Sequence, residues 1–581
     1  MSVVHVKING IPVEVEAGSS VLAAATAAGV KIPTLCYHED IKPTAACGLC
    51  IVKMEGSPKI QRACASPVQE GASYITDDPE LFQARKTVIE LILSTHPADC
   101  LTCIRNQNCE LQKLAADFGI REIPFDARVK RLPKDESSPS IILEPTKCIK
   151  CGRCVEVCQD LQGVYALEYV GRGDGSQMQP ACNLPLNDSP CVKCGQCAAH
   201  CPVGAIYERD DTDLVRQAIN DPAKTVVVNI APSVRVGIGE EFGMGDGALT
   251  VGKLYTGLRQ LGFDKVFDTN FAADLTIMEE GSELVHRLTH GGVLPQLTSC
   301  CPAWTDYMEK YYPDMIPNFS SAKSPMQMQG PITKTYWAQK AGIDPATIVN
   351  VAVMPCTAKK FEIGRDENMS ASGYKDTDIS ITTRELARMF KAKGIDLSVL
   401  PESDVDDPIG EYSGAGTIFG NTGGVMEAAI RTAYWAVTGK ELEGVDVDAV
   451  RGPEGIKTAT IKAGDLDLKV AIVSGLGNVK TVLEEVRKAR AEGKEPPYHF
   501  IEVMACKGGC ISGGGQPYAS STPNRAARTA GLYADDKRSA VRCSHQNPSI
   551  KKIYDEFLGA PLSEKSEELL HTKYHQRPIY Q

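Results

Sequence analysis

The cysteines are the residues of this chain whose type and spacing could do the most chemistry. The 581-residue chain contains 22 of them, and most recur in Cys-x2-Cys groups. Small secreted proteins use such cysteines for disulfides, whereas large chains without a signal peptide use them to bind metals or iron–sulfur clusters. The first residues alternate polar and apolar side chains as a strand does, so no signal peptide is predicted. We therefore expect metal or cluster ligands, with zinc open for any single pair.

A glycine-rich stretch from Ile501 to Pro517 holds Cys506 and Cys510. The apolar run over residues 500–505 predicts a buried strand that leads into it. Five glycines between residues 508 and 515 would let the backbone lie close against a bulky group. A disulfide between the two thiols is the simpler alternative, but the cysteine usage of the whole chain favours a metal.

The first cysteine group has the spacing Cys-x10-Cys-x2-Cys-x13-Cys. Four thiolates on loops around a small sheet suit a 2Fe-2S cluster. Alternation over residues 4–16 around Asn9-Gly10 predicts a β-hairpin, and a helix is expected from about Val21 to Ala28. The expected ligands are Cys36, Cys47, Cys50 and Cys64.

A second group follows a helix that is predicted from Pro79 to Thr95. It supplies one imidazole and three thiolates, and on spacing alone zinc and a 4Fe-4S cluster are about equally favoured. Its place between a 2Fe-2S module and a ferredoxin module favours iron–sulfur. A neutral imidazole in place of a thiolate raises the reduction potential of such a site. The expected ligands are His96, Cys100, Cys103 and Cys109.

Two copies of one cysteine pattern follow a proline-rich stretch, residues 124–145, that is predicted to be a linker. Each copy reads Cys-x2-Cys-x2-Cys-x3-Cys, the pattern of bacterial two-cluster ferredoxins, in which the fourth cysteine of each copy binds the other cluster. One 4Fe-4S cluster is therefore assigned Cys148, Cys151, Cys154 and Cys201. The other is assigned Cys191, Cys194, Cys197 and Cys158.

Beyond Thr225, apolar β-branched runs alternate with long amphipathic stretches, which predicts an α/β domain with parallel sheets. The predicted strands are residues 226–230, 348–353, 468–473 and 500–503. Ligands of such sheets usually bind beyond the carboxyl ends of the strands. Three loops could do chemistry there: residues 298–304, residues 354–362 and the glycine-rich stretch. Their cysteines could hold one more 4Fe-4S cluster through Cys301, Cys356, Cys506 and Cys510.

The three loops resemble the three signature motifs of the FeFe (iron-only) hydrogenases. The 2Fe-2S and His-ligated groups resemble the modules that open these enzymes and the large peripheral subunit of respiratory complex I, so the resemblance covers nearly the whole chain. It implies an H-cluster, which is a 4Fe-4S cubane joined through one cysteine to a di-iron subsite with CO, cyanide and a bridging dithiolate amine. By motif, Cys301, Cys356, Cys506 and Cys510 are the cubane ligands, and Cys510 is the bridge.

The resemblance also implies a proton path, because splitting hydrogen requires a nearby group that accepts the proton. Cys300 is not needed as a ligand, and its thiol can relay protons. Glu280 and Glu283, at i and i+3 of a predicted helix, and Ser320 match the relay positions of the family. Without the motif match, a solvated helix face would explain the two carboxylates as well as a proton relay does.

Further residues of the chain match positions that line the H-cluster pocket in the family. Lys359 and Ser233 match residues that hydrogen-bond the cyanide ligands, although such a lysine is otherwise more often a surface residue. The remaining wall positions, each of which is more often plain core, are Ala231, Pro232, Pro325, Gln327, Met354, Phe419 and Met504.

Two positions depart from the family pattern and two cysteines are left over. Ala303 stands where most members have glycine, which predicts either a less free backbone or a tighter pocket beside Cys301. Lys507 follows a ligand directly, and its charge is expected to bias the potential of the cubane. Cys182 and Cys543 are expected to be ordinary buried thiols.

The predicted fold class is multidomain α+β and α/β. Residues 1–78 form a ubiquitin-like 2Fe-2S ferredoxin domain and residues 79–123 a His-ligated 4Fe-4S domain. Residues 138–210 form a bacterial two-cluster ferredoxin domain, and residues 211–581 a large α/β hydrogenase domain that binds the H-cluster. The cofactors are thus one 2Fe-2S cluster, three accessory 4Fe-4S clusters and the H-cluster.

The function that the resemblance implies is reversible H2 oxidation and proton reduction, with electrons relayed through the N-terminal clusters. The segments over residues 100–115 and 135–141 look more like subunits of heteromeric, NAD(P)-linked and electron-bifurcating hydrogenases than like the stand-alone ferredoxin-dependent enzymes, which are the alternative. A non-catalytic iron–sulfur assembly protein would not need Cys300 or Lys359, and a hydrogen sensor would carry a signalling domain.

The expected partners are H2 and protons, ferredoxin, flavin- and NAD(P)-binding subunits, and H-cluster maturation proteins. NAD(P) and flavin are placed on other subunits because the chain has no dinucleotide fingerprint, and residues 413–424 lack the Lys-Ser/Thr of a phosphate loop. The net charge of -11 disfavours a nucleic-acid partner. No run of about 20 apolar residues could span a membrane, so a cytoplasmic protein is expected.

Overall fold

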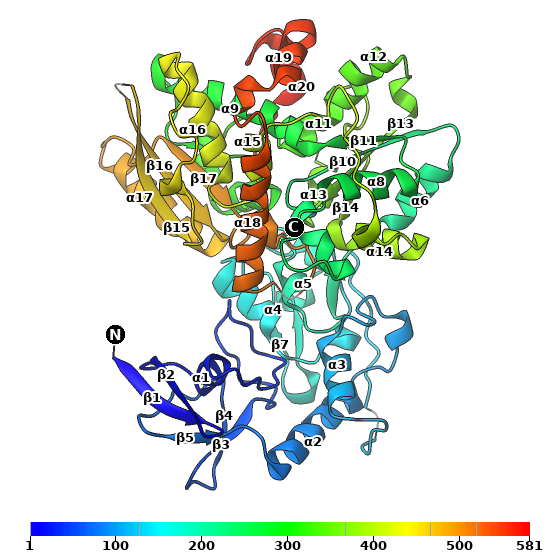
Figure 1. The fold of residues 1–581 in the computed structure, drawn as a ribbon, viewed down its shortest axis with the longest axis vertical. Helices are drawn as coiled ribbons and strands as arrows, with labels where there is room; N and C mark the ends of the chain where they lie inside the picture. Colours follow the sequence, from blue (N-terminus) through cyan, green and yellow to red (C-terminus); the bar gives the residue numbers. More distant parts are fainter. Residues whose placement is uncertain (1, 127, 366–367, 465, 519, 581) are drawn as a thin grey trace.

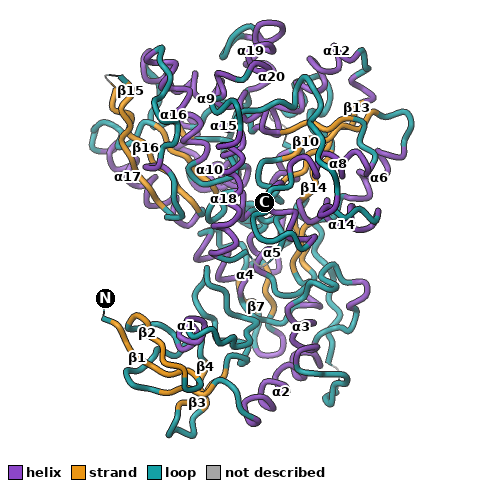
Figure 2. Tube along the Cα trace, in the orientation of Figure 1, coloured by secondary structure: helices purple, strands orange, loops and turns teal. Residues whose placement is uncertain are grey.

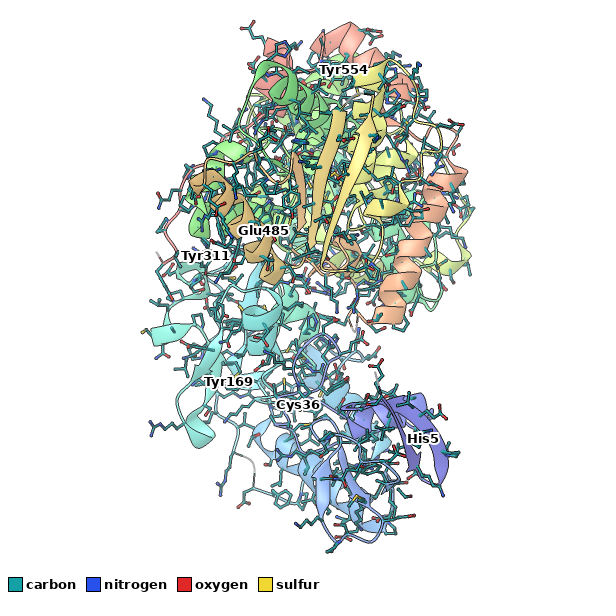
Figure 3. All side chains as sticks on the ribbon, turned by 90° about the vertical axis from the view of Figure 1, so that its left-hand side faces the viewer. His5, Cys36, Tyr169, Tyr311, Glu485 and Tyr554 are labelled. Carbon is teal, nitrogen blue, oxygen red and sulfur yellow. The ribbon has the colours of Figure 1, made fainter. Side chains whose placement is uncertain are left out.

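The computed structural model describes residues 2–126, 128–365, 368–464, 466–518 and 520–580. Figure 1 shows a smaller lobe built from the N-terminal third of the chain and a larger lobe built from the rest. The helix α18 (Thr522–Arg538) runs along the larger lobe toward the smaller one. In Figure 3, His5 lies at the outer edge of the smaller lobe and Cys36 lies closer to the larger one.

The N-terminal domain is a five-stranded sheet with the strand order β2-β1-β5-β3-β4. Asn9 and Gly10, with φ of 51° and 80°, turn the chain between the first two strands, which confirms the predicted hairpin. Ser20 caps α1, and Gly29 follows its end. The elements are β1 (Val3–Ile8), β2 (Ile11–Glu16), α1 (Val21–Ala27), β3 (Ile51–Met54), β4 (Ile60–Arg62) and β5 (Ser73–Ile75).

Two helices connect this sheet to the ferredoxin part. The helix α2 (Pro79–Thr95) has the predicted bounds, because Asp78 caps it and Pro79 begins it. Arg85 is buried on α2 and donates hydrogen bonds to the carbonyls of Leu49, Ile51 and Thr76, which ties the helix to the sheet. The helix α3 (Glu110–Asp117) follows the second cysteine group.

The ferredoxin part contains two short helices, α4 (Arg153–Glu156) and α5 (Gln196–His200). The strand β6 (Ile141–Leu143) pairs antiparallel with β9 (Ile206–Glu208), and β7 (Glu168–Val170) pairs with β8 (Gln177–Gln179). Residues 141–143 were predicted as linker, and that prediction is wrong. They are buried because this apolar run closes the sheet beneath the cluster loops.

The larger lobe contains two sheets of four strands, which Figure 2 shows on either side of α18. The first is parallel throughout in the order β11-β10-β13-β14, and the second has the order β12-β17-β16-β15 with only β15 antiparallel. All four predicted strands are present, lengthened by one or two residues at one or both ends. The strands are β10 (Thr225–Ile230), β11 (Lys265–Asp268), β12 (Gln296–Leu297), β13 (Ile348–Met354), β14 (Ile379–Thr382), β15 (Ile456–Ala463), β16 (Leu466–Ser474) and β17 (Phe500–Met504).

Helices cover both sheets, and the inner strands are buried because their apolar side chains pack against these helices on both faces. The edge strand β15 is partly exposed. The helices that reach the site are α9 (Thr269–His290), α10 (Pro302–Tyr311), α11 (Pro325–Ile332) and α13 (Ala358–Glu362). The helix α16 (Gly424–Thr438) packs against α9. The others are α6 (Thr212–Asn220), α7 (Val234–Gly237), α8 (Val251–Leu261), α12 (Ala338–Ala341), α14 (Thr383–Lys393), α15 (Gly414–Ile418), α17 (Val479–Ala491), α19 (Pro548–Ile553) and α20 (Glu564–Leu570). Over the described residues, no helix has the length and apolar content needed to cross a bilayer.

Candidate active site and cluster-binding sites

A cavity lies between the two sheets, where the loops after β10, β13 and β17 meet. It holds about 830 Å³ of empty space and has an almost entirely apolar lining. Such a cavity beyond the carboxyl ends of parallel strands is where an α/β domain is expected to bind its ligand. Four cysteines share its wall: Cys301, Cys356, Cys506 and Cys510.

Three separate loops bring these four thiols together. Cys301 directly precedes α10, Cys356 follows β13, and Cys506 and Cys510 follow β17. Burial raises the pKa of each thiol, that of Cys356 to about 12. None of the 22 cysteines forms a disulfide. Four convergent thiols in an apolar cavity fit an iron–sulfur cluster, whose metal ions stabilise the thiolate form.

The glycines of the 506–517 loop allow the three loops to pack on one another. A Cβ on Gly509, which has φ of 99°, would lie 2.6 Å from the Thr422 nitrogen. A Cβ on Gly513 would lie 2.1 Å from the Pro355 oxygen. Both glycines line the cavity, but their missing side chains would collide with neighbouring backbone. Glycine is therefore required here for close backbone contact as well as for cavity space.

Seven of the eight predicted pocket residues line the cavity, namely Ala231, Pro232, Ser233, Pro325, Met354, Phe419 and Met504. Gln327 is not among the lining residues. It is buried on α11, and its side-chain amide has no hydrogen-bond partner in the described ranges of the chain. Thr269 and Ala273 of α9 also line the cavity, but no local signal in a single sequence distinguishes them from core residues. Ala303 lines it as well, so its methyl group takes up space beside Cys301.

Lys359 lies in the cavity wall on α13. Its ammonium group is 2.7 Å from the Glu362 carboxylate and donates to the Cys300 carbonyl at 3.2 Å. Burial alone would lower the pKa of Lys359, but the ion pair with Glu362 outweighs burial and raises it. The lysine is therefore a buried cation at the edge of an apolar cavity, where it can hold an anionic ligand.

The predicted relay residues lie along one side of α9. Cys300 lines the cavity, whereas Glu280 is fully buried, and neither of its carboxylate oxygens has a hydrogen-bond partner within the described part of the chain. Burial, with repulsion from Glu283, raises the pKa of Glu280 to about 8. Ser320 donates to Glu283 at 2.7 Å. Arg287, which the sequence reasoning missed, binds the other Glu283 oxygen at 2.6 Å.

The side chains of Glu283 and Arg287 are 14% and 13% exposed, so this row of groups runs from the cavity toward the surface. The spacing of four residues between Glu283 and Arg287 on one helix could have indicated this pair. A buried carboxyl group that titrates near neutral pH, placed between a cavity thiol and a surface carboxylate, can accept and release protons.

The accessory cysteines also gather in groups. Cys148, Cys151, Cys154 and Cys201 line one cavity of about 430 Å³. In the N-terminal domain, the sulfur atoms of Cys36 and Cys47 are 3.4 Å apart, and the Cys50 and Cys64 thiols hydrogen-bond each other. Burial, together with repulsion from the thiolate forms of Cys194, Cys191 and Cys158, raises the pKa of Cys197.

The His96 group surrounds a cavity of about 300 Å³. Its members Cys100, Cys103 and Cys109 line the cavity together with the imidazole. The buried Nδ1 of His96 has no hydrogen-bond partner among the described residues. An unpartnered buried imidazole nitrogen facing three thiols fits a metal or cluster ligand.

The second ferredoxin group touches the central cavity directly. Cys194 lines that cavity, and the Gln196 amide donates to the Cys506 sulfur at 3.1 Å and to the Ser512 carbonyl at 2.9 Å. Thr357 donates to the Lys193 carbonyl at 2.7 Å. Electron exchange falls off with distance, so direct contact between the two sites suits electron transfer.

The leftover cysteines differ in their surroundings. Cys543 is buried as predicted, but Cys182 is exposed, so its prediction as a buried thiol is wrong. It lies in a turn with φ of 55°, outside the hydrophobic clusters of the ferredoxin part.

Comparisons with protein families agree with this architecture. Residues 224–514 match the iron only hydrogenase large subunit, C-terminal domain, and residues 522–577 match the iron hydrogenase small subunit. Residues 2–78 match a 2Fe-2S iron-sulfur cluster binding domain and residues 147–205 a 4Fe-4S dicluster domain. Residues 85–124 match the NADH-ubiquinone oxidoreductase-G iron-sulfur binding region.

Individual relatives extend over the whole chain. It is 46% identical to the NADP-reducing hydrogenase subunit HndD of Solidesulfovibrio fructosivorans, over 99% of this chain and 100% of that protein. It is 40% identical to iron hydrogenase 1 of Clostridium pasteurianum, over 98% and 99% of the two chains. The solved structure of an apo FeFe hydrogenase variant from Chlamydomonas reinhardtii is 44% identical, with a TM-score of 0.56 over 63% of this chain and 99% of that one. The chain belongs to the iron-only (FeFe) hydrogenase family.

Proposed function

We propose that the chain is the catalytic subunit of an NAD(P)-linked hydrogenase complex and carries out reversible H2 oxidation and proton reduction. The observation that carries this proposal is the apolar cavity in which four thiols, a buried lysine and a relay thiol meet. The full-length likeness to an NADP-reducing hydrogenase subunit supports the NAD(P)-linked role.

The cavity residues have separate parts in the proposal. The thiols of Cys301, Cys356, Cys506 and Cys510 would hold the H-cluster through its cubane, with Cys510 as the bridge to the di-iron subsite. When bound, this cofactor supplies the redox metal centre at which hydrogen is split or formed. Lys359 and Ser233 would hold its cyanide ligands, and the apolar wall keeps water away from it.

The proton path follows from the row of groups along α9. Cys300 carries a proton at its sulfur between the cavity and Glu280, whose raised pKa lets the carboxyl group both take and give it near neutral pH. Ser320 and Glu283 continue the path, and Arg287 holds Glu283 in place near the surface.

Electrons would travel through the smaller lobe. We assign one 2Fe-2S cluster to residues 1–78, a His-ligated 4Fe-4S cluster to residues 79–123, two 4Fe-4S clusters to residues 138–210 and the H-cluster to residues 211–581. The ligands of the accessory clusters are those given by the cysteine spacings. Such a protein would contain about 20 iron atoms: two, four and eight in the accessory clusters and six in the H-cluster.

The proposed partners follow from this assignment. Flavin- and NAD(P)-binding subunits would receive the electrons, ferredoxin would be a second acceptor in electron bifurcation, and maturation proteins would insert the H-cluster. We place the complex in the cytoplasm of an anaerobic cell. A stand-alone ferredoxin-dependent hydrogenase is the second candidate, because iron hydrogenase 1 also matches the full length.

The two candidates are separated by anaerobic purification from the native host followed by assays of H2-dependent reduction. Flavoprotein subunits that co-purify, with H2-dependent NAD(P) reduction by the intact complex, are expected. A single polypeptide that reduces ferredoxin but not NAD(P) would support the stand-alone enzyme. Zinc in place of most of the iron would contradict both.

A further inference from the structure

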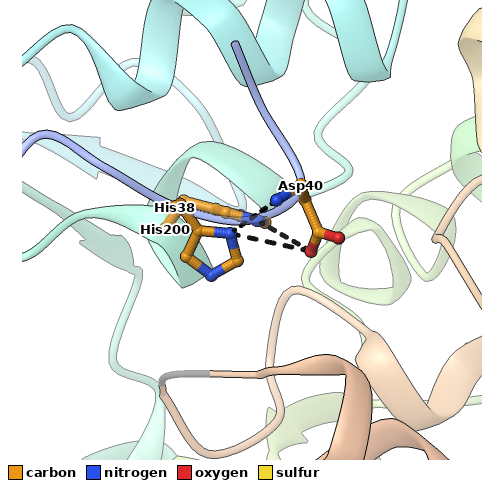
Figure 4. Close-up of side chains that lie close together, drawn as sticks. All are labelled: His38, Asp40 and His200. Carbon is orange, nitrogen blue, oxygen red and sulfur yellow. Dashed lines mark hydrogen bonds and ion pairs between the residues drawn. The ribbon is translucent and has the colours of Figure 1, made fainter. Parts of the chain in front are cut away.

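Asp40 occupies the point where three parts of the chain meet. It belongs to the loop between Cys36 and Cys47, and its side chain is only 2% exposed. Figure 4 shows it beside His38 of the same loop and His200 of α5, with the His200 Nε2 atom 3.8 Å from its carboxylate. The N-terminal domain thereby reaches the ferredoxin part and the larger lobe through one buried carboxylate.

The carboxylate of Asp40 is fully occupied by two cations of the larger lobe. Its Oδ1 accepts from the Lys507 ammonium at 2.6 Å and from the Arg525 guanidinium at 2.8 Å. Its Oδ2 accepts from Arg525 at 2.7 Å. A metal ion bound by Asp40 and the two histidines would have to displace both cations, so the cluster is an ion-pair site rather than a metal site.

Both cations belong to the surroundings of the cubane ligands. Lys507 directly follows Cys506, and Arg525 lies on α18 with its Cδ 3.6 Å from the position of a Cβ on Gly508. Glu39 adds a second acidic group, because it accepts from the Thr522 hydroxyl at 2.9 Å and from Arg525 at 3.3 Å. Two acidic and two basic side chains therefore balance one another beside the ligand loop.

This balance of charges affects the reduction potential of a cluster bound beside it. The reduction potential of an iron–sulfur cluster depends on nearby charge, and an unpaired cation favours the more negative, reduced form. The Lys507 side chain is 41% exposed, but its ammonium group is held at the buried Asp40. Removing Asp40 would leave the lysine charge unbalanced and its side chain free to move.

We propose that Asp40 of the 2Fe-2S domain is a positioning residue for the active site, which anchors Lys507 and neutralises its charge so as to set the reduction potential of the cubane. The inference rests on the proposed function, since it requires the cubane at Cys506 and Cys510. It assigns the lysine at this motif position a partner that is 467 residues away in the sequence.

The test is a redox titration of the assembled holoenzyme. The infrared and electron paramagnetic resonance signals of the protein monitor the titration and give the midpoint potential of the cubane. The substitution Asp40→Asn keeps the shape of the side chain and is expected to shift the midpoint potential of the cubane to more positive values. Lys507→Gln is expected to shift it to more negative values. The double variant is expected to lie close to the wild type, because it restores the charge balance.

Glu80→Gln is the matched control. Glu80 lies on the α2 helix, its side chain is 68% exposed, and its carboxylate pairs with Lys53. The substitution therefore removes the same charge as Asp40→Asn, but far from the ligand loop. The midpoint potential of the cubane in the Glu80→Gln variant is expected to equal that of the wild type. Iron content and the 2Fe-2S signal of each variant show whether the protein is folded and loaded.

Equal cubane potentials in the wild type, Asp40→Asn and Lys507→Gln would overturn the inference while leaving the proposed function intact. A wild-type protein without any cubane signal would instead contradict the proposed function. If the Asp40→Asn variant loses its clusters, the potential of the Lys507→Gln variant alone tests the inference. The Lys507 side chain is 41% exposed, and the Asp40 carboxylate keeps its ion pair with Arg525 when the lysine is replaced, so no buried charge is left unpaired. An unchanged potential in that variant also overturns the inference.

Discussion

At the scale of single residues, the site depends on groups whose surroundings give them properties that they lack in water. Over the residues that the structure describes, the Glu280 carboxyl group has no hydrogen-bond partner, and burial raises its pKa to about 8. Glu283, one helical turn away, is held by Ser320 and Arg287. Burial raises the pKa of Glu280, whereas the Glu283 side chain reaches the surface. Cys300 lies at the cavity end of this row.

The substitution Cys300→Ala tests the start of the proton path. Removing the only thiol that lines the cavity without being assigned as a ligand is expected to lower hydrogen turnover by about 100-fold or more, because a positioned proton carrier contributes on that order. Iron content and cluster signals are expected to stay at the wild-type level. Cys182→Ala, at an exposed cysteine, is the control and should turn over normally. Equal turnover in both variants would contradict the relay role.

The buried Glu280 also predicts how stability depends on pH. Its folded pKa of about 8 lies above the ordinary value of 4.5, so the folded state holds this proton more tightly. The stabilisation is complete below about pH 4.5 and is lost as the pH rises toward 8.

Glu280→Gln removes this titration. The free energy of unfolding of the variant relative to the wild type is expected to rise with pH between 5 and 8, by at most about 1.4 kcal/mol per pH unit, and to level off above pH 8. Thermal unfolding of both proteins under anaerobic conditions measures the difference. A difference that does not change with pH would show that Glu280 is already ionised in the folded protein.

At the scale of elements, the loops that follow β13 and β17 connect the ferredoxin part to the cavity. Gln196 of α5 donates to the Cys506 sulfur, and Gly514 lies against the backbone of Cys194 and Gly195. A Cβ on Gly514 would lie 2.4 Å from the Cys194 oxygen. The close approach of the two loops therefore requires glycine at this position.

The substitution Gly514→Ala is expected to push the ferredoxin loop away from the ligand loop. Hydrogen-dependent reduction of the electron acceptor should fall, because electron transfer slows as the two cluster-binding loops move apart. Exchange of H2 with D2O needs no electron transfer through the accessory clusters and should continue. Gly175→Ala, where an added Cβ meets nothing within 4 Å, is the control. Equal loss of both reactions in Gly514→Ala would contradict a role in electron transfer.

Sequence reasoning predicted the local elements well where a short-range signal exists. The Asn9-Gly10 turn, the Asp78 cap with Pro79, and the β-branched runs of the sheets all have physical causes within a few residues. The strand over residues 141–143 was missed because prolines on both sides of an apolar run look like a linker. It forms through pairing with β9, about 65 residues later in the sequence.

Long-range contacts explain the other differences. The partner of Lys507, the place of Gln327 behind the cavity wall and the exposure of Cys182 depend on how distant segments pack. The metal ligands were easier to propose, because each cluster type demands several thiols at fixed spacings. Their assignment remains a prediction that cluster spectroscopy can test.

At the scale of the whole molecule, the smaller lobe is proposed to deliver electrons and the larger lobe to perform the chemistry. The ferredoxin part touches the cavity through Cys194 and Gln196, and the N-terminal domain touches the ligand loop through Asp40. The total iron content is expected to be about 20 atoms per chain. A preparation with about six irons would show that only the larger lobe is loaded.

The most direct test of the central claim is hydrogen–deuterium exchange by the purified, matured protein under H2 in D2O. This reaction reports hydrogen splitting and proton transfer at the cavity without any electron acceptor or partner subunit. The account predicts that HD forms, and that its formation is lost when Cys510→Ser removes the proposed bridging thiol. A protein that carries the full iron content and the accessory cluster signals but forms no HD would contradict the account.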